Sequence, residues 1–129
     1  MLDTDTCIYL IKNKLASVQS RLIANESFGI ALSVITQSEL YFGVEKSGSK
    51  RNHTALELFL RPLVVLDFDS AAARVYGQIR CLLESAGRPI GPLDTQIAAH
   101  AISSDLILVT NNVREFSRVP NLRIENWAQ

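Results

Sequence analysis

The segment GPLDTQIAAHAISSDLILVT, residues 91–110, contains a helical pattern followed directly by the pattern of a buried strand. Gly91 and Pro92 end a loop, and apolar residues then recur at helical spacing over residues 94–103. Residues 106–109 are all apolar and have polar neighbours, which is typical of a strand buried on both faces of a parallel sheet. The segment therefore predicts an α/β fold in which helices cover a central sheet.

The rest of the chain repeats this alternation. Short apolar runs at residues 28–32 and 63–66 predict two further strands, and helical spacing predicts helices over residues 5–12, 16–24, 34–46, 52–60 and 71–85. We therefore expect a three-layer α/β/α sandwich with a central parallel sheet. We expect residues 1–129 to form a single domain, because the length suits one hydrophobic core and the chain contains no repeat or linker.

The composition is that of an ordinary globular protein. The 129 residues are 47% hydrophobic and 20% charged, and 13 Lys and Arg residues balance 13 Asp and Glu residues. A net charge of zero argues against a protein that binds nucleic acid through its overall field. Cys7 and Cys81 lie far apart without metal-binding spacing, so we expect neither a disulfide scaffold nor a zinc site. The sequence has no signal peptide pattern and no membrane span, and we therefore expect a cytoplasmic protein.

Three acidic residues stand where a parallel sheet places its ligands. Open α/β folds bind ligands beyond the carboxyl ends of their strands, and Asp3, Glu39 and Asp94 each fall at a strand end or on an adjoining helix. For Asp3 and Asp94 an ordinary alternative is that the carboxylate only caps a helix, as Asp5 also could. For Glu39, at the edge of an apolar helix stripe, the alternative is that the side chain reaches out to water.

Taken together, the three acids predict a metal site. Carboxylates at close range cannot all stay ionised without a countercharge, and a divalent cation with oxygen ligands is the natural one. We therefore expect Mg²⁺, with Mn²⁺ as the alternative. After residues 106–109, the side chains of Thr110, Asn112 and Glu115 offer polar groups that could orient a bound water or these acids. The same segment could instead be only a polar turn before a short helix, with Phe116 in the core.

Four segments in order carry a resemblance to a known family. They are LDTDTCIYL (residues 2–10), SVITQSELYFGVEKS (33–47), IGPLDTQIAAHA (90–101) and LVTNNVREFSRVPNLRIENW (108–127). Each motif is weak alone, but the four in this order and spacing resemble the PIN-domain ribonucleases, specifically the VapC toxins of bacterial toxin–antitoxin pairs. The resemblance covers essentially the whole chain.

The resemblance implies a role for each of four acidic residues. The metal-binding aspartate after the first strand of the family falls on Asp3, the helix glutamate on Glu39 and the third acid on Asp94. The family often has asparagine where this chain has Asp5, so that Asp5 would add negative charge at the rim of the site without being required as a ligand. The resemblance therefore implies that Asp3, Glu39 and Asp94 are both the metal ligands and the catalytic residues.

The chain departs from the family pattern at one position. Many PIN domains have a fourth aspartate where this chain has Asn112. The amide of Asn112 would still position water, and Glu115, one turn later, would partly replace the missing charge. The substitution leaves an alternative function open, in which the chain is a catalytically impaired PIN module that acts as an RNA- or protein-binding scaffold.

The function that the resemblance implies is that of an Mg²⁺-dependent endoribonuclease toxin. Similar proteins cut tRNA in the anticodon region, including initiator tRNA, so we expect a tRNA substrate. The family also implies neutralisation by a cognate VapB-like antitoxin, a toxin homodimer, and a toxin–antitoxin assembly that reaches operator DNA through the antitoxin. We expect no membrane partner.

A phosphoacceptor receiver domain is the strongest alternative from another class, because Asp67 follows the apolar run 63–66. That fold needs a lysine after a late strand, whereas all four lysines of this chain lie at or before position 50.

His100 lies six residues after Asp94 and off the helix face that carries Asp94. We therefore interpret His100 as a structural histidine rather than a catalytic base.

Overall fold

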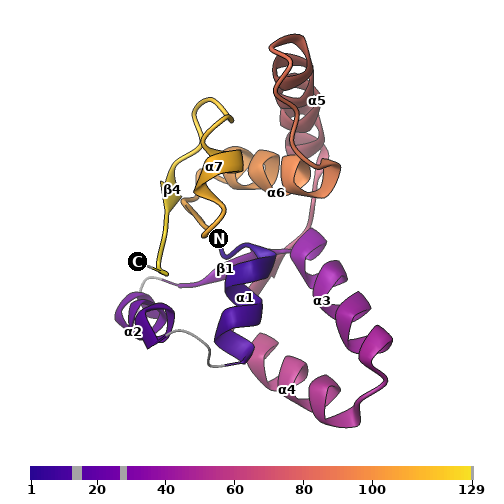
Figure 1. Cartoon of the computed structure of the whole chain (residues 1–129), viewed down its shortest axis with the longest axis vertical. Helices are drawn as coiled ribbons and strands as arrows, with labels where there is room; N and C mark the ends of the chain where they lie inside the picture. Colours follow the sequence, from indigo (N-terminus) through magenta and orange to yellow (C-terminus); the bar gives the residue numbers. More distant parts are fainter. Residues whose placement is uncertain (13–15, 27–28, 129) are drawn as a thin grey trace.

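The computed structural model describes residues 1–12, 16–26 and 29–128 of the chain (Figure 1). In chain order its elements are α1 (Thr4–Ile11), α2 (Ala16–Asn25), β1 (Ala31–Ser33), α3 (Val34–Ser47), α4 (Lys50–Leu60), β2 (Val64–Leu66), α5 (Ser70–Ser85), α6 (Pro92–Ser103), β3 (Leu108–Val109), α7 (Val113–Phe116) and β4 (Ile124–Glu125). Every predicted helix is present, and its ends lie within about two residues of the predicted ones, the usual uncertainty of a helix boundary.

Two pairs of parallel strands form the sheet, and the backbone at Leu2 joins them. β1 pairs with β2, and β3 pairs with β4. Leu2 makes parallel bridges to Leu32 of β1 and to Val109 of β3. The order across the sheet is therefore β2, β1, Leu2, β3 and β4, and all of these segments run in the same direction, as the sequence predicts.

The strands are shorter than the apolar runs that predict them. In the β1–β2 pair Ala31 lies opposite Val64, and in the β3–β4 pair Leu108 lies opposite Ile124. β1 ends at Ser33, one residue beyond the predicted strand 28–32, the first residue of which lies outside the described residues. β4 has only two residues and was not predicted, because so short a strand shows no periodicity.

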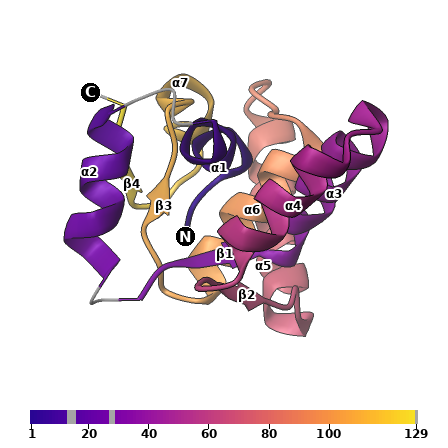
Figure 2. The ribbon, with the colours of Figure 1, turned by 90° about the horizontal axis from the view of Figure 1, so that it is seen from below.

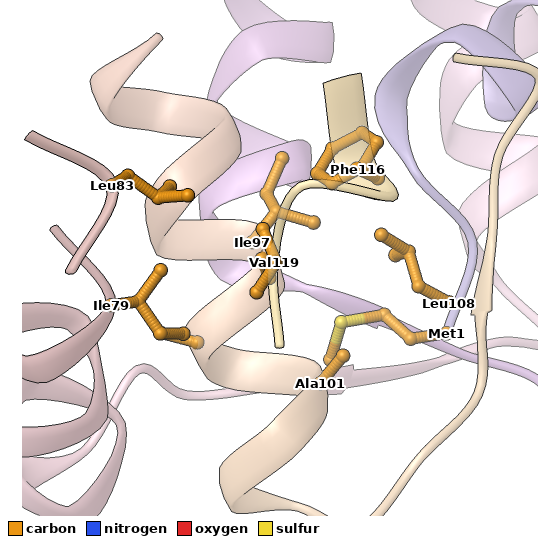
Figure 3. Packing of buried hydrophobic residues seen from close by; sticks show 10 residues of the cluster. Met1, Ile79, Leu83, Ile97, Ala101, Leu108, Phe116 and Val119 are labelled. Atoms are coloured by element: carbon orange, nitrogen blue, oxygen red, sulfur yellow. The ribbon is translucent and has the colours of Figure 1, made fainter. Parts of the chain in front are cut away.

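Helices cover both faces of the sheet, which confirms the α/β/α sandwich. In Figure 1, α5, α6 and α7 lie above β1, and α1, α3 and α4 lie below it. Successive residues of a strand point to opposite faces. Accordingly, Met1 and Leu108 pack with α5, α6 and α7, whereas Leu2 and Val109 pack with α1 to α4. Figure 3 shows the first of these clusters, in which Met1 and Leu108 meet Ile79, Leu83, Ile97, Ala101, Phe116 and Val119.

The second face is built around α1, which lies between α2 and the antiparallel hairpin of α3 and α4 (Figure 2). Gly48 closes α3 with a φ of 63°, a conformation that glycine adopts without strain, and Ser49 caps α4 by accepting a hydrogen bond from the backbone N–H of Asn52. Leu40 and Leu56 are buried on this face. The hairpin thereby holds the first turns of α3 at the edge of the sheet.

Of the helices in the described residues, none combines the length and the apolar character that crossing a membrane requires.

Candidate active site

Asp3 lies at the centre of the carboxyl edge of the sheet, directly after the bridge at Leu2. Its backbone N–H donates to the carbonyl oxygen of Val109 at 3.0 Å. Its carboxylate oxygen Oδ1 accepts a hydrogen bond of 2.9 Å from the backbone N–H of Thr6, which makes Asp3 the N-cap of α1. Asp3 therefore caps α1, whereas Asp5, which is exposed in the first turn of α1, does not.

The carboxyl group of Asp3 is held in a buried position. Only 4% of the residue is exposed, and this burial raises the pKa of the carboxyl group. Hydrogen bonding by the side chain of Thr110 and by the backbone N–H of Thr6 lowers the pKa in part, while the charge of Asp5 raises it. Ionised Asp3 is therefore costly in free energy, and a cation beside it would offset that cost.

Glu39 reaches the same edge from the second turn of α3. Ser33 fixes the start of this helix, because its hydroxyl oxygen accepts a hydrogen bond of 3.0 Å from the backbone N–H of Ile35. Glu39 is half-buried, and its Oε1 accepts a hydrogen bond of 2.7 Å from the hydroxyl of Thr4. A hydroxyl donor thus compensates this carboxylate, so the interpretation of Glu39 as a side chain that only reaches water is wrong.

Asp94 is the third residue of α6 and does not cap it. Gly91 is the N-cap and makes no side-chain capping bond, and Pro92 begins the helix, two residues before the predicted start. A proline in the first turn needs no N–H partner, which is why the helix begins there. The interpretation of Asp94 as a simple cap is therefore wrong. Its carboxylate lies near the positive end of the α6 dipole, a position that favours negative charge.

The electrostatics of Asp94 show which acids share its surroundings. Its pKa is raised to about 6, first by burial and then by the charges of four other carboxylates. In decreasing order of effect these are Glu115, Glu39, Asp3 and Asp5. The structure therefore brings together the three acids that we predicted as ligands and the two that we predicted as supporting residues, from the starts of α1 and α3, from α6 and from α7.

The segment after β3 adds polar groups to this cluster. The Thr110 hydroxyl is fully buried, bonds to Asp3, and accepts a hydrogen bond of 2.9 Å from the backbone N–H of Asn112. The side-chain amide of Asn112 donates to Oε2 of Glu115 at 3.2 Å. The short helix α7 follows, and buried Phe116 anchors it in the core, as the simpler interpretation of this segment expects. The role of these polar side chains in orienting a bound water or the acids stays a prediction.

The chemistry of these donors fits a divalent cation, although their spacing is not that of a closed cage. Within residues 1–12, 16–26 and 29–128, no three His, Cys, Asp or Glu side chains are close enough to form a ready-made set of metal ligands. Mg²⁺ usually binds through only one or two carboxylates and keeps several of its waters. An Asp94 carboxylate on which the charges of four other carboxylates act therefore suits a hydrated ion better than a site closed by protein.

Two residues of the site could not be assigned from the sequence. Thr4 contacts Glu39, and the Thr4 hydroxyl oxygen lies 3.4 Å from that of Thr36, which is fully buried in the first turn of α3. Threonine beside the first aspartate indicates only a helix cap when it is read from sequence. The sequence signal that could have identified Thr4 as a site residue is its position between two acids at a strand end.

His100 lies outside the acidic cluster. Its Nδ1 pairs with the Ser33 hydroxyl at 2.8 Å, which agrees with a structural role.

Comparison with known proteins gives the family. Residues 1–122 match the model of the PIN domain family. The chain is 50% identical over 129 residues to the tRNA(fMet)-specific endonuclease VapC of Shigella flexneri, with 99% of this chain and 97% of that protein covered.

Two solved structures are also similar. VapBC2 from Rickettsia felis, bound to a DNA fragment from its promoter, superposes with a TM-score of 0.92 at 41% identity, with 98% of this chain and 97% of that one covered. DNA-bound VapBC from Salmonella typhimurium superposes with a TM-score of 0.91 at 48% identity, with 98% and 96% covered. The chain therefore belongs to the PIN domain family, among its VapC ribonucleases. The predicted family is confirmed, and the receiver-domain alternative is wrong.

Proposed function

We propose that this chain is a divalent-metal-dependent endoribonuclease that acts as the toxin of a toxin–antitoxin pair. The observation that supports this most directly is the gathering of acids at the carboxyl edge of the sheet, where burial first, and then the charges of four other carboxylates, raise the pKa of Asp94 to about 6. Such a concentration of negative charge at the carboxyl edge of a parallel sheet is unfavourable by itself, and a bound cation relieves it. Membership of the VapC ribonucleases supplies the reaction class.

Asp3, Glu39 and Asp94 would hold the ion, directly or through its bound waters, with Mg²⁺ as the first choice and Mn²⁺ as the alternative. When bound, the ion would make a water nucleophilic at neutral pH and offset charge on the attacked phosphate. Asp3 is fixed by its capping bond to the Thr6 backbone N–H, so this carboxylate would orient the ion against the sheet. Thr4 bonds to Oε1 of Glu39, which leaves Oε2 to bind the ion or to accept a proton from the attacking water.

The supporting residues would act on these acids rather than on the RNA. The Thr110 hydroxyl holds Asp3, and Asn112 holds Glu115 through its side-chain amide. Glu115 would supply some of the negative charge that an aspartate at position 112 would otherwise give, and Asp5 would add more at the exposed rim. In this arrangement, Asn112 is compatible with an active enzyme, which disfavours the alternative of an impaired scaffold.

The names of the relatives suggest the substrate and the partner. The Shigella flexneri relative is named as specific for tRNA(fMet), and the Rickettsia felis and Salmonella typhimurium relatives were solved as VapBC on DNA. We infer that this chain cleaves tRNA, with the anticodon region of initiator tRNA as the expected site. We further infer a VapB-like antitoxin that neutralises it and carries the complex to operator DNA, and self-association of the toxin into a homodimer.

The test of the activity is incubation of the purified protein with total tRNA and Mg²⁺, followed by gel analysis of discrete fragments. We expect cleavage by the wild type, none with EDTA, and a loss of about a hundredfold or more in Asp94→Asn. Asp67→Asn is the matched control, because Asp67 is exposed at the end of β2 and does not act on Asp94. A wild type that binds tRNA in a gel shift but never cuts it, in Mg²⁺ or Mn²⁺, would support the scaffold instead.

A further inference from the structure

The hydroxyl of Thr4 makes a short contact to a carboxylate of the acidic cluster. Thr4 is the first residue of α1, and it lies between the N-cap Asp3 and the exposed Asp5. The distance from Thr4 Oγ1 to Glu39 Oε1 is 2.7 Å, which is characteristic of a strong hydrogen bond from a hydroxyl to a carboxylate. This bond joins the start of α1 to the second turn of α3.

The direction of the hydrogen bonds around Thr4 follows from its single proton. A threonine hydroxyl has one proton and two lone pairs, so when the proton goes to Glu39 the oxygen can only accept from another donor. The Thr36 hydroxyl lies 3.4 Å away and is fully buried, one helical turn before Glu39 on α3. The 2.7 Å contact from Thr4 to Glu39 is much shorter than the 3.4 Å separation of Thr4 from Thr36, which is at the limit of a hydrogen bond. The proton of Thr4 is thereby directed toward the carboxylate.

The consequence for Glu39 is a fixed side-chain position. A glutamate side chain has three rotatable bonds and loses considerable freedom when it is held. Glu39 is only half-buried, and it faces a cluster whose other members are all negatively charged. Repulsion from Asp3 and Asp94 would favour rotation of the carboxylate toward water, and the bond from Thr4 opposes that rotation.

We propose that Thr4 is a positioning residue, which holds the Glu39 carboxylate toward Asp3 and Asp94 so that the three acids can bind one cation. This inference rests on the proposed function, because it assumes that the acidic cluster is the metal site. In this proposal Thr4 acts through its hydrogen bond to Glu39 and not on the ion or the RNA directly. Its effect is on how Glu39 is presented.

The test compares Thr4→Val, which keeps the branched shape and removes the hydroxyl, with Thr4→Ser, which keeps the hydroxyl. In Thr4→Val we expect kcat for tRNA cleavage to fall about tenfold to a hundredfold with KM for tRNA unchanged. We expect the Mg²⁺ dissociation constant, measured by titration calorimetry without RNA, to rise by about tenfold. Thr4→Ser should stay within about threefold of the wild type in both measurements.

The matched control is Thr54→Val on α4, where the hydroxyl donates to the Lys50 carbonyl oxygen and the residue is exposed. It should leave both quantities unchanged. If Thr4→Val does not fold, Thr4→Ala provides the same loss of the hydroxyl with a better helix former. Wild-type Mg²⁺ affinity and kcat in a folded variant without the hydroxyl would overturn the inference.

A double-mutant cycle separates positioning from a general structural effect. If Thr4 acts through Glu39, then Thr4→Val should cause no further loss of Mg²⁺ affinity in the Glu39→Gln background. Equal losses in both backgrounds would contradict the inference. Failure of the proposed function is recognised separately, because the wild type itself would then neither bind Mg²⁺ nor cleave tRNA.

Discussion

Glu115 lies close enough to Asp94 that, after burial, its charge is the largest influence on the pKa of the Asp94 carboxyl group. The two residues come from α7 and α6, and the strand β3 separates them in the chain. The amide of Asn112 holds Glu115 in place through a hydrogen bond of 3.2 Å to Oε2. A carboxylate one turn after Asn112 thus acts on Asp94, as the proposed partial replacement of the missing fourth aspartate requires.

The first prediction concerns the stability of the protein without metal. The pKa of Asp94 is about 6 in the folded protein, above its ordinary value of 3.8, so folding favours the protonated form of its carboxyl group. The stability that this carboxyl contributes is fully present below pH 3.8 and is lost as the pH rises through 6. At pH 7.5 in EDTA, Asp94→Asn should therefore be more stable than the wild type, by about 1 to 2 kcal/mol after allowance for solvent screening.

Urea denaturation in EDTA at pH 7.5 and at pH 4 measures this difference. The advantage of Asp94→Asn should shrink toward zero at pH 4, where the wild-type carboxyl is largely protonated. Glu26→Gln provides the comparison for loss of an exposed carboxylate, because Glu26 acts on neither Asp94 nor His100. If Asp94→Asn is less stable than the wild type at pH 7.5, the cluster does not repel Asp94 as the structure indicates.

The second prediction concerns metal addition. Mg²⁺ at a hundred times its dissociation constant should raise the free energy of unfolding of the wild type by about 2.7 kcal/mol. The increase should be mostly absent in Asp94→Asn, because the variant lacks one of the proposed ligands. It should also be smaller at pH 5 than at pH 7.5 in the wild type, because Asp94, with its pKa of about 6, must lose its proton to bind the ion.

Thermal unfolding with increasing Mg²⁺ measures this effect without RNA. An equal rise in Tm for wild type and Asp94→Asn would show that Mg²⁺ binds elsewhere. Removal of the ion with EDTA should return the wild type to its original Tm, since binding and folding are reversible steps of one equilibrium.

The third prediction concerns the position at which the chain departs from its family pattern. Asn112→Asp replaces the amide that donates to Glu115 with a second carboxylate. Without metal this variant should lose about 1 kcal/mol of stability, because a hydrogen bond becomes a repulsion. With saturating Mg²⁺ the loss should be recovered, because the added charge favours the cation. Asn52→Asp is the control, because Asn52 is exposed on α4. An equal gain of stability with Mg²⁺ in Asn112→Asp and Asn52→Asp would contradict the prediction.

The positions of the acids could be predicted from sequence because they depend on strand direction. Once residues 63–66 and 106–109 are read as parallel strands, the segments that follow must meet at one edge of the sheet, and Asp3 and Thr110 lie there. Helix starts were less certain. Pro92 begins α6 without any capping side chain, and the search for a capping residue placed the start at Asp94 instead.

Other features depend on contacts that leave no local pattern. The bridge through Leu2 involves a single residue on each side, and β4 has only two, so neither produces periodicity. The bond between Thr4 and Glu39 joins residues 35 positions apart. It exists because α1 and α3 cross at the sheet edge, and no spacing within either segment specifies that crossing.

The last prediction concerns His100, which joins α6 to the end of β1. Only 2% of His100 is exposed, its Nδ1 pairs with the Ser33 hydroxyl at 2.8 Å, and its ring meets that of Phe68 edge-on at 5.5 Å. Burial lowers the pKa of His100, which the charges of Asp69 and Asp67 and a bond to the Asp67 backbone only partly oppose. The imidazole is therefore neutral in the folded protein, and His100→Ala should cost about 2 to 4 kcal/mol through the lost bond and the cavity.

The pH dependence of His100 has the opposite sign to that of Asp94. Because its folded pKa lies below the ordinary value of 6.5, the stability that His100 contributes is present above pH 6.5 and is lost as the pH falls below it. In the wild type, protonation of Asp94 offsets part of this loss. Asp94→Asn should therefore lose stability more steeply than the wild type between pH 7 and pH 5 in urea denaturation. In the double variant Asp94→Asn/His100→Gln, the glutamine keeps hydrogen-bonding groups but cannot titrate, so stability should fall less steeply with decreasing pH. An unchanged slope would show that a group other than His100 causes the pH dependence.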